Sequence, residues 1–258
     1  MRQITVKCEN IKKTFVLSRK QQKIDRAPDR YKVAVNGLSF EAYAGEIFGL
    51  LGSNGAGKTT TLRIISTLIK ADSGNVEILG RNLKENPDFV REHVGFLTSE
   101  LKLEDFFTPN YLFDYFAELH GVEKNTAEAR KSVLFDKFGI NKFAEVKVAD
   151  LSSGMKQKVS MAIALVHDPD IIVFDEPTNG LDVITARTVT DYLTELKNRG
   201  KTIIISTHIF SLAERLCDRV GIIIEGKMSR CAPLAELVGE SNLEDVFFDL
   251  YSKEATAL

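Results

Sequence analysis

With 258 residues, 44% of them hydrophobic, the chain is long enough to bury a sizeable core in one large α/β domain or two small ones. A net charge of −2 offers no overall attraction for nucleic acid, so we expect no nucleic-acid partner. The longest apolar runs, such as residues 171–174 and 220–224, fall far short of the roughly 20 residues that span a bilayer, so a membrane role would be peripheral.

The amino terminus, Met1 to Lys7, lacks the continuous apolar stretch of a signal peptide, and we therefore expect a cytoplasmic chain. Three cysteines, Cys8, Cys217 and Cys231, are odd in number and form no CxxC pair. This pattern fits reduced thiols better than a metal site or a disulfide framework.

The first part of the chain is predicted to be rich in β-strands. Residues 3–8 alternate as a strand does, and residues 33–43 form another, with Asn36-Gly37 as a turn or bulge. Between them, residues 12–32 hold eight basic side chains against two acidic ones. This basic segment is either a solvated loop or a contact for anionic headgroups or for the acidic surface of a partner.

A short apolar strand over residues 46–51 runs directly into a glycine-rich loop, and residues 60–70 have helix-like content. The loop matches G-x-x-x-x-G-K-[ST] in full, in the strand-to-helix context of a phosphate-binding loop. Its backbone N–H groups converge on phosphate oxygens, Lys58 neutralises β/γ charge and so acts in catalysis, and the Thr59 hydroxyl can ligate Mg²⁺. We expect nucleotide contacts from Gly52, Ser53, Asn54, Gly55, Ala56, Gly57, Lys58, Thr59 and Thr60.

Residues 100–150 are predicted to form a mainly helical insert. Thr108 can cap the start of a helix, Pro109 suits its first position and Gly121 is a plausible stop, while a second helix covers residues 127–138. We expect an apolar stripe that packs in a core rather than binding a ligand, formed by Leu112, Tyr115, Phe116 and Leu119.

After this insert, helices and buried strands alternate. Residues 155–167 and 186–199 are predicted helices, and residues 171–174 and 202–206 are predicted strands. Alternation of this kind is typical of a parallel, doubly wound sheet.

Two carboxylates follow the buried strand 171–174. Asp175 lies where a magnesium-binding carboxylate leaves the carboxyl end of such a strand. Glu176 points differently from Asp175 and can polarise the water that attacks the γ-phosphate, a general-base effect of roughly 10²–10⁴-fold.

The phosphate-binding loop and three later motifs, four in all, resemble those of the ATP-binding subunits of ABC transporters. Residues 151–155 (LSSGM) resemble the signature motif, residues 175–182 (DEPTNGLD) the second Walker motif and D-loop, and Thr207-His208 the switch histidine. The resemblance implies an α/β fold: a P-loop NTPase (RecA-like) parallel-sheet core with an antiparallel β lobe and an inserted helical signature subdomain. It also implies one ATPase domain over 1–240, with the β lobe at 1–50 and 70–82, the core at 51–69 and 160–225, the helical subdomain at 100–158, and a C-terminal tail at 241–258.

The resemblance further implies a head-to-tail dimer, of two copies or of two different ATP subunits, with two ATP and Mg²⁺ in the interface. Ser152 and Gly154 would meet the partner's γ-phosphate at a helix start. By the same resemblance His208 contacts the γ-phosphate and the attacking water, and Asp182 couples the two sites. The remaining partners are membrane-spanning permease subunits, which places the chain on the inner face of the cell membrane.

The chain departs from the family pattern in the signature motif, where Ser153 replaces the first glycine and Met155 replaces glutamine, and at two further places. Phe15 occupies the place of the adenine-stacking aromatic, but the basic segment 16–30 follows it and makes Tyr31 a rival. Ser99 stands where the family carries a coupling glutamine, and either Glu100 or a bridging water is left to replace it.

Residues 155–158 and 242–247 resemble the bacterial drug- and sodium-export branch, and residues 95–100 resemble sodium-extruding exporters. This implies an exporter with Na⁺ as candidate cargo. The alternatives are a soluble ABC ATPase without a transport role and a regulatory module that binds ATP without hydrolysing it. A single cassette disfavours the first, and the intact catalytic side chains, Glu176 among them, disfavour the second.

Overall fold

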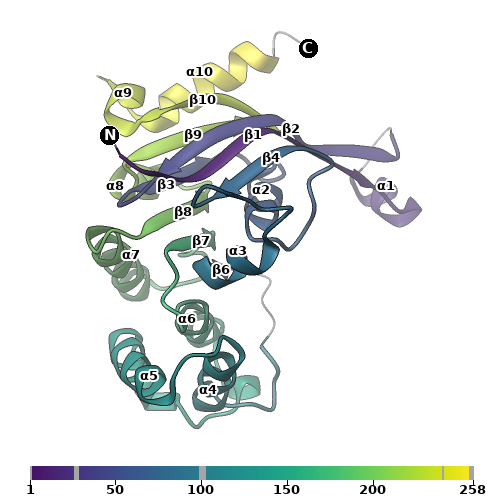
Figure 1. Cartoon of the computed structure of the whole chain (residues 1–258). Helices are drawn as coiled ribbons and strands as arrows, with labels where there is room; N and C mark the ends of the chain where they lie inside the picture. Colours follow the sequence, from purple (N-terminus) through teal and green to yellow (C-terminus); the bar gives the residue numbers. More distant parts are fainter. Residues whose placement is uncertain (1, 26–28, 99–102, 240, 256–258) are drawn as a thin grey trace.

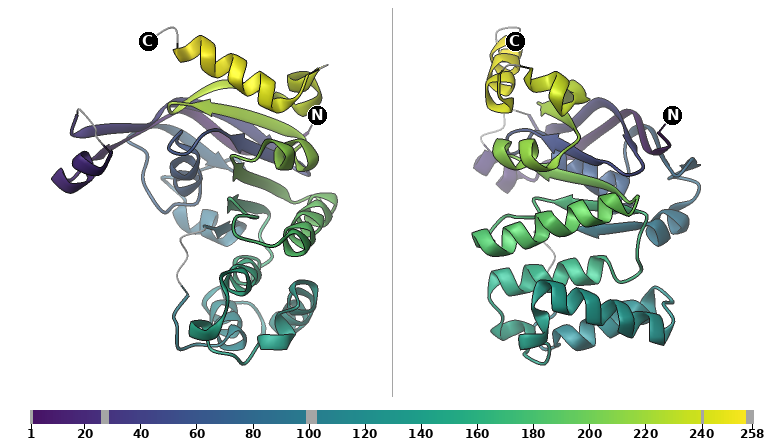
Figure 2. Two further views of the ribbon diagram at one scale, coloured as in Figure 1. Left: turned by 180° about the vertical axis from the view of Figure 1, so that it is seen from behind. Right: turned by 90° about the vertical axis from the view of Figure 1, so that its left-hand side faces the viewer.

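The computed structural model describes residues 2–25, 29–98, 103–239 and 241–255. Two sheets occupy one half of the molecule, and helices α4 (Pro109–Leu119), α5 (Lys124–Phe138) and α6 (Ser153–Ala164) form a group at the opposite end (Figure 1, Figure 2). The C-terminal helix α10 (Leu243–Ala255) lies at the end of the molecule farthest from that group. Sheet core, β lobe and helical insert are therefore all present.

The larger sheet has six strands in the order β10-β9-β3-β8-β7-β6. Neighbouring strands from β9 to β6 run parallel, whereas β10 pairs antiparallel with β9. Both faces are covered, so the central strands are apolar runs without alternation, as parallel sheets require. The strands are β3 (Ile47–Leu51), β6 (Val94–Leu97), β7 (Ile171–Asp175), β8 (Thr202–Thr207), β9 (Arg219–Ile224) and β10 (Lys227–Pro233).

The smaller sheet is antiparallel, in the order β2-β1-β4-β5. Its strands are β1 (Ile4–Val16), β2 (Tyr31–Tyr43), β4 (Ser73–Ile78) and β5 (Arg81–Asn82). The first strand is much longer than predicted because its pairing with β2 continues to Val16 and Tyr31. Gly37 makes a bulge rather than a turn, since Ile11 pairs with Leu38 and Lys12 with Asn36.

Helix α4 begins as predicted, with the Thr108 hydroxyl accepting a hydrogen bond from the Tyr111 N–H. Its buried face was predicted only in part. Leu112 is buried, but Tyr115 and Leu119 are exposed, because α4 packs on α5 through Phe113, whose ring meets Phe135 edge-on at 5.5 Å.

The remaining helices lie between strands or, for the last of them, between the final strand and α10. They are α1 (Arg19–Asp25), α2 (Lys58–Ile65), α3 (Pro87–His93), α7 (Val183–Asn198), α8 (Phe210–Leu216) and α9 (Leu234–Val238), with 3₁₀ turns at Ile140–Phe143 and Val148–Asp150. Throughout the described parts of the chain, none of the helices has the length and apolar character that a membrane span requires.

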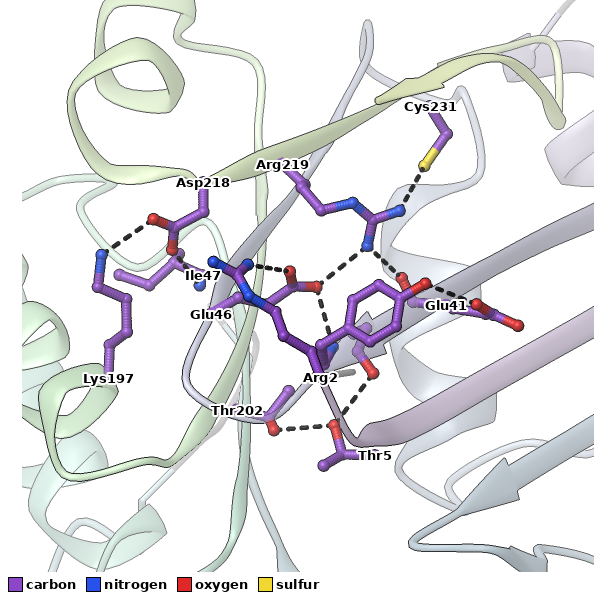
Figure 3. Close-up of polar contacts among 12 residues, drawn as sticks. Arg2, Thr5, Glu41, Glu46, Ile47, Lys197, Thr202, Asp218, Arg219 and Cys231 are labelled. Carbon is purple, nitrogen blue, oxygen red and sulfur yellow. Dashed lines mark hydrogen bonds and ion pairs between the residues drawn. The ribbon is translucent and has the colours of Figure 1, made fainter. Parts of the chain in front are cut away.

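A polar network joins the two sheets at the amino end of β3 (Figure 3). Glu46 is fully buried there, and its Oε1 accepts from Arg219 Nη1 at 3.2 Å and from the Tyr43 N–H at 2.9 Å. The same guanidinium donates to the Glu41 carbonyl at 2.9 Å, and the Thr5 and Thr202 hydroxyls are 2.8 Å apart. The two sheets are thus held together at the end of β3 opposite the glycine-rich loop.

Candidate functional site

The carboxyl ends of β3, β8 and β7 lie side by side, because these strands are neighbours and parallel. The glycine-rich loop leaves β3, Asp175 ends β7 and Glu176 follows it, and His208 comes directly after β8. Motifs that are far apart in the sequence therefore meet at one edge of the sheet, where ligands bind in open α/β folds.

Two glycines of the loop between β3 and α2 are required by their own surroundings. Gly57 has φ of +106°, and a Cβ there would lie 2.3 Å from the Ala34 carbonyl oxygen. A Cβ at Gly52 would lie 2.5 Å from the Ile223 carbonyl oxygen. The loop can therefore pass this close to β2 and β9 only without side chains at these positions.

Lys58 is 5% exposed and folds back onto the loop that precedes it. Its ammonium donates to the carbonyls of Gly52 and Ser53, at 2.7 and 3.1 Å, and lies 3.8 Å from Glu176 Oε1. Burial lowers the pKa of Lys58, while Glu176 and Asp175 oppose that shift. A cation is thus held at the centre of a loop suited to phosphate.

Asp175 and Thr59 form a small cluster of oxygen atoms. Asp175 is 2% exposed, and its Oδ1 accepts from the Thr59 hydroxyl at 3.1 Å and from the Ser206 hydroxyl. Carboxylate and hydroxyl oxygens are ligands that Mg²⁺ prefers, and the two already share one point in space. The residues present therefore fit a magnesium ion bound by Thr59 and Asp175.

Glu176 has a strained backbone, with φ of +51°. Its N–H is held by the Ser206 carbonyl at 3.2 Å and hydroxyl at 3.1 Å, while its Oε1 lies 2.9 Å from Nδ1 of His208. A non-glycine residue in this conformation costs on the order of 1–3 kcal/mol and is concentrated at functional sites. Here it turns the carboxylate away from Asp175 and towards His208.

These groups line one pocket of about 600 Å³, within the range of small-molecule sites. Phe15 lines it together with Lys32, its cross-strand neighbour in β2. Tyr31, the rival for adenine stacking, is not among the described lining residues. The lining also contains residues that sequence reasoning did not select, namely Val16, Leu17, Gln21, Lys32, Ala34 and Asn179.

The predicted loop residues that line the pocket are Ser53, Asn54, Gly55, Gly57, Lys58, Thr59 and Thr60. The predicted residues Asp175, Glu176 and His208 line it as well. Gly52 and Ala56 are not among the described residues that line the pocket. Both instead lie against residues 223–226. Ala56 is 4% exposed, and its carbonyl accepts from the Gly226 N–H at 3.0 Å.

Three predicted site residues lie elsewhere. Among the described residues that line this pocket, Ser152, Gly154 and Asp182 do not occur. Ser152 caps α6 by accepting from the Met155 N–H, and Asp182 caps α7 by accepting from the Thr185 N–H and hydroxyl. These bonds to Thr185 hold the pKa of Asp182 below its usual value. Ser99 and Glu100, the residues considered for the coupling position, lie outside the described residues.

A glycine-rich loop cradling a buried lysine, beside a buried aspartate, a half-buried glutamate and a histidine, defines a P-loop protein that hydrolyses nucleotides. The sequence profile of the family described as "ABC transporter" matches residues 35–179. The chain belongs to this family, as one of its ATP-binding, ATP-hydrolysing subunits. The predicted fold and the predicted ATPase activity are thereby confirmed.

Individual relatives agree with the family assignment. The "ABC transporter ATP-binding protein NatA" of Bacillus subtilis is 37% identical over 231 residues, which cover 88% of this chain and 94% of that protein. The "Nod factor export ATP-binding protein I" of Burkholderia orbicola is 39% identical over 228 residues, covering 88% and 74%.

Solved structures extend the similarity to three dimensions. An ATP-binding subunit of an ABC transporter matches with a TM-score of 0.84 at 25% identity, covering 96% of this chain and 99% of that one. A dimeric ATP-binding cassette in a post-hydrolysis state, bound to ADP and Pi, matches with a TM-score of 0.76 at 25% identity, covering 88% and 98%.

Proposed function

We propose that the chain works as a head-to-tail dimer around two Mg-ATP and powers export through separate membrane-spanning subunits. In this proposal the pocket residues of one chain bind ATP, and Ser152, Gly154 and Asp182 of the other chain complete the site. The proposal includes a single ATPase domain over residues 1–240 and a cytoplasmic position on the inner face of the membrane. The dimer can consist of two copies or of two different ATP subunits.

The main observation that supports the proposed dimer is the position of Gly154. Unlike Gly57, it has no positive φ, and unlike at Gly52 and Gly57, no backbone atom would collide with a Cβ there: among the described residues it would meet one atom, Leu181 Cδ2, at 3.8 Å. Glycine inside a helix is unfavourable by roughly 0.5–1 kcal/mol relative to alanine, so its own chain gains nothing from it. A bare backbone at the start of α6 is useful for close approach by a group from outside the chain.

A second observation supports the same surface. Val183 and Ile184, directly after Asp182, are 86% and 80% exposed, more than any other large hydrophobic side chain among the described residues. Exposed apolar side chains of this kind mark contacts with other molecules. A structurally similar cassette is dimeric, which favours a second ATP subunit as the partner.

The geometry supports an in-line attack of water on the γ-phosphorus of ATP. Glu176 takes a proton from the water as the new O–P bond forms, and the bond to the β-phosphate oxygen breaks to give ADP and phosphate. His208, 2.9 Å from the Glu176 carboxylate, orients that base, and Lys58 is placed to neutralise charge on the phosphates. Bound by Thr59 and Asp175, Mg²⁺ would supply further charge neutralisation at the phosphate oxygens.

Export rests on relatives and on an uncovered aromatic surface. Phe106, Tyr111 and Tyr115 of the helical insert are 63%, 50% and 50% exposed, as a surface that docks on a membrane subunit would be. A relative 39% identical to this chain is named for export of Nod factor. The resemblance of residues 95–100 to sodium-extruding exporters makes Na⁺ the cargo to test first.

The test uses Glu176→Gln, which removes the base and leaves the pocket shape unchanged. We expect ATP turnover to fall roughly 10²–10⁴-fold while ATP-dependent dimers accumulate, as seen by size-exclusion chromatography with light scattering. Normal turnover in this variant would refute Glu176 as the base.

Gly154→Leu, added to Glu176→Gln, is the matched control for the dimer. The free space around Gly154 predicts a folded monomer that binds ATP, but no dimer. If ATP still drives dimerisation of this double variant, the head-to-tail arrangement is wrong. The soluble ABC ATPase remains the alternative function, and sedimentation of the native protein away from cell membranes would favour it.

A further inference from the structure

The basic segment after Phe15 folds into a short helix beside the nucleotide pocket. Helix α1 stands clear of the main body at the end of the β1–β2 pair (Figure 1, Figure 2). The segment between β1 and β2 that contains α1 is closed at its base, where the Leu17 N–H donates to the Arg30 carbonyl at 2.8 Å and the Leu17 side chain is buried. Within it, Val16, Leu17 and Gln21 line the pocket that also contains Phe15.

Ser18 and Gln21 form a reciprocal pair of hydrogen bonds at the start of α1. The Gln21 N–H donates to the Ser18 hydroxyl oxygen at 3.2 Å, and Gln21 Oε1 accepts from the Ser18 N–H at 3.1 Å. The Ser18 hydroxyl also donates to Gln21 Oε1, at 3.0 Å. This S-x-x-Q pattern is a capping box, which sets the direction of the Gln21 side chain.

The capping box leaves one group of Gln21 for a ligand. Its Oε1 is occupied twice, and among the described residues none accepts a hydrogen bond from its Nε2. An amide nitrogen carries two N–H donors. Gln21 therefore lines the pocket with a side chain whose amide donors have no acceptor among the described residues, in an element that leads directly back to Phe15.

We propose that Gln21 Nε2 donates a hydrogen bond to the nucleoside part of bound ATP, so that α1 helps to set nucleotide affinity. The purine ring nitrogens and the ribose oxygens are acceptors of the required kind. The phosphates, in contrast, have their own donors in the loop 52–59 and in Lys58. This inference assumes that ATP binds in this pocket, as proposed above.

The experiment compares variants of Gln21 by isothermal titration calorimetry with two probes, Mg-ATP and Mg-tripolyphosphate. Tripolyphosphate carries the phosphate chain and lacks the nucleoside. Gln21→Ala removes both the capping oxygen and the donors, whereas Gln21→Glu keeps the capping oxygen and removes the donors. Gln22→Ala is the matched control, because Gln22 is the next residue of α1 and is not among the described residues that line the pocket.

Both Gln21 variants are expected to bind ATP about 3- to 10-fold more weakly, the effect of losing one neutral hydrogen bond. Their affinity for tripolyphosphate, and the affinity of Gln22→Ala for both probes, should equal that of the unmodified chain. ATP affinity retained in Gln21→Glu would mean that Gln21 only caps α1, and would overturn the proposal.

An equal loss of affinity for tripolyphosphate in Gln21→Glu would also overturn the proposal. The effect would then come from the added negative charge or from the phosphates, not from the nucleoside. Failure of the unmodified chain to bind ATP would have a different meaning, because it would refute the nucleotide site itself, whatever the variants show.

Discussion

At the scale of single residues, the site depends on backbone positions that few side chains can occupy. Gly55 and Gly57 both have positive φ, at +83° and +106°, yet their surroundings differ. A Cβ at Gly57 would collide with the Ala34 carbonyl oxygen, whereas among the described residues nothing lies within 4 Å of a Cβ at Gly55. The loop geometry therefore depends on a clash at one glycine and on φ alone at the other.

This difference predicts that Gly57→Ala lowers the free energy of unfolding by about 2 kcal/mol or more and abolishes ATP binding. Gly55→Ala has the same unfavourable φ without the collision and should cost about 1 kcal/mol. Urea unfolding and ATP titration of the two variants check the prediction. Equal destabilisation by both substitutions would show that the contact with Ala34 does not matter.

The sequence motifs were sufficient to select the phosphate end of the pocket, because G-x-x-x-x-G-K-[ST] places its backbone and its lysine within eight consecutive residues. The opposite end could not be selected in this way. Gln21 and Lys32 reach the pocket only because β1 and β2 pair as far as Val16 and Tyr31, and Asn179 reaches it only because β7 lies beside β8. Strand pairing between segments that are separated in the sequence cannot be recognised from a local pattern of residues.

At the scale of elements, capping residues predicted where a helix begins, whereas the elements against which a helix packs could not be predicted. Thr108 and Pro109 predicted the start of α4 correctly, since a cap is a local interaction. Its buried face was misjudged because the arrangement of α5 and α6 around it decides which side is covered. Short helices such as α8 and α9 were not predicted, because seven and five residues give too little periodicity.

One contact between elements gives a pH-dependent prediction. The His167 ring, just after α6, stacks on His120 at the end of α4 with centroids 4.0 Å apart. Burial, with a smaller effect of His120, lowers the pKa of His167 to about 4, well below its ordinary value of 6.5. Between these two values the folded chain binds fewer protons than the unfolded chain, so its stability falls as the pH falls.

We expect the free energy of unfolding to drop by about 2 kcal/mol through His167 alone between pH 8 and pH 5. His167→Asn removes the titrating ring and should show a correspondingly smaller loss. Urea denaturation of both proteins at a series of pH values measures the difference. Parallel pH profiles would contradict the role of His167.

At the scale of the whole molecule, alternation of helix and strand predicted the parallel sheet, but it could not predict how the antiparallel sheet is fixed to it. That attachment depends on Glu46 and Arg219, which are 173 residues apart in the chain. The Arg219 guanidinium also lies over the Tyr43 and Phe48 rings, at 4.8 and 5.5 Å from their centroids. Because residues of both sheets line the pocket, this junction helps to keep the two ends of the pocket in a fixed relative position.

Arg219→Ala would leave the Glu46 carboxylate buried without its nearest charged partner, a situation that typically costs about 3–5 kcal/mol. The carboxylate already has a raised pKa because of its burial, so the loss of Arg219 should raise that pKa further. The matched variant Arg219→Met with Glu46→Gln replaces the ion pair by neutral groups and should recover much of the stability. Chemical denaturation and ATP titration, run together, test whether loss of this junction changes the affinity of the pocket for ATP. We expect ATP affinity to fall in Arg219→Ala and to return in the double variant, and an unchanged affinity in both would show that the site tolerates a loosened junction.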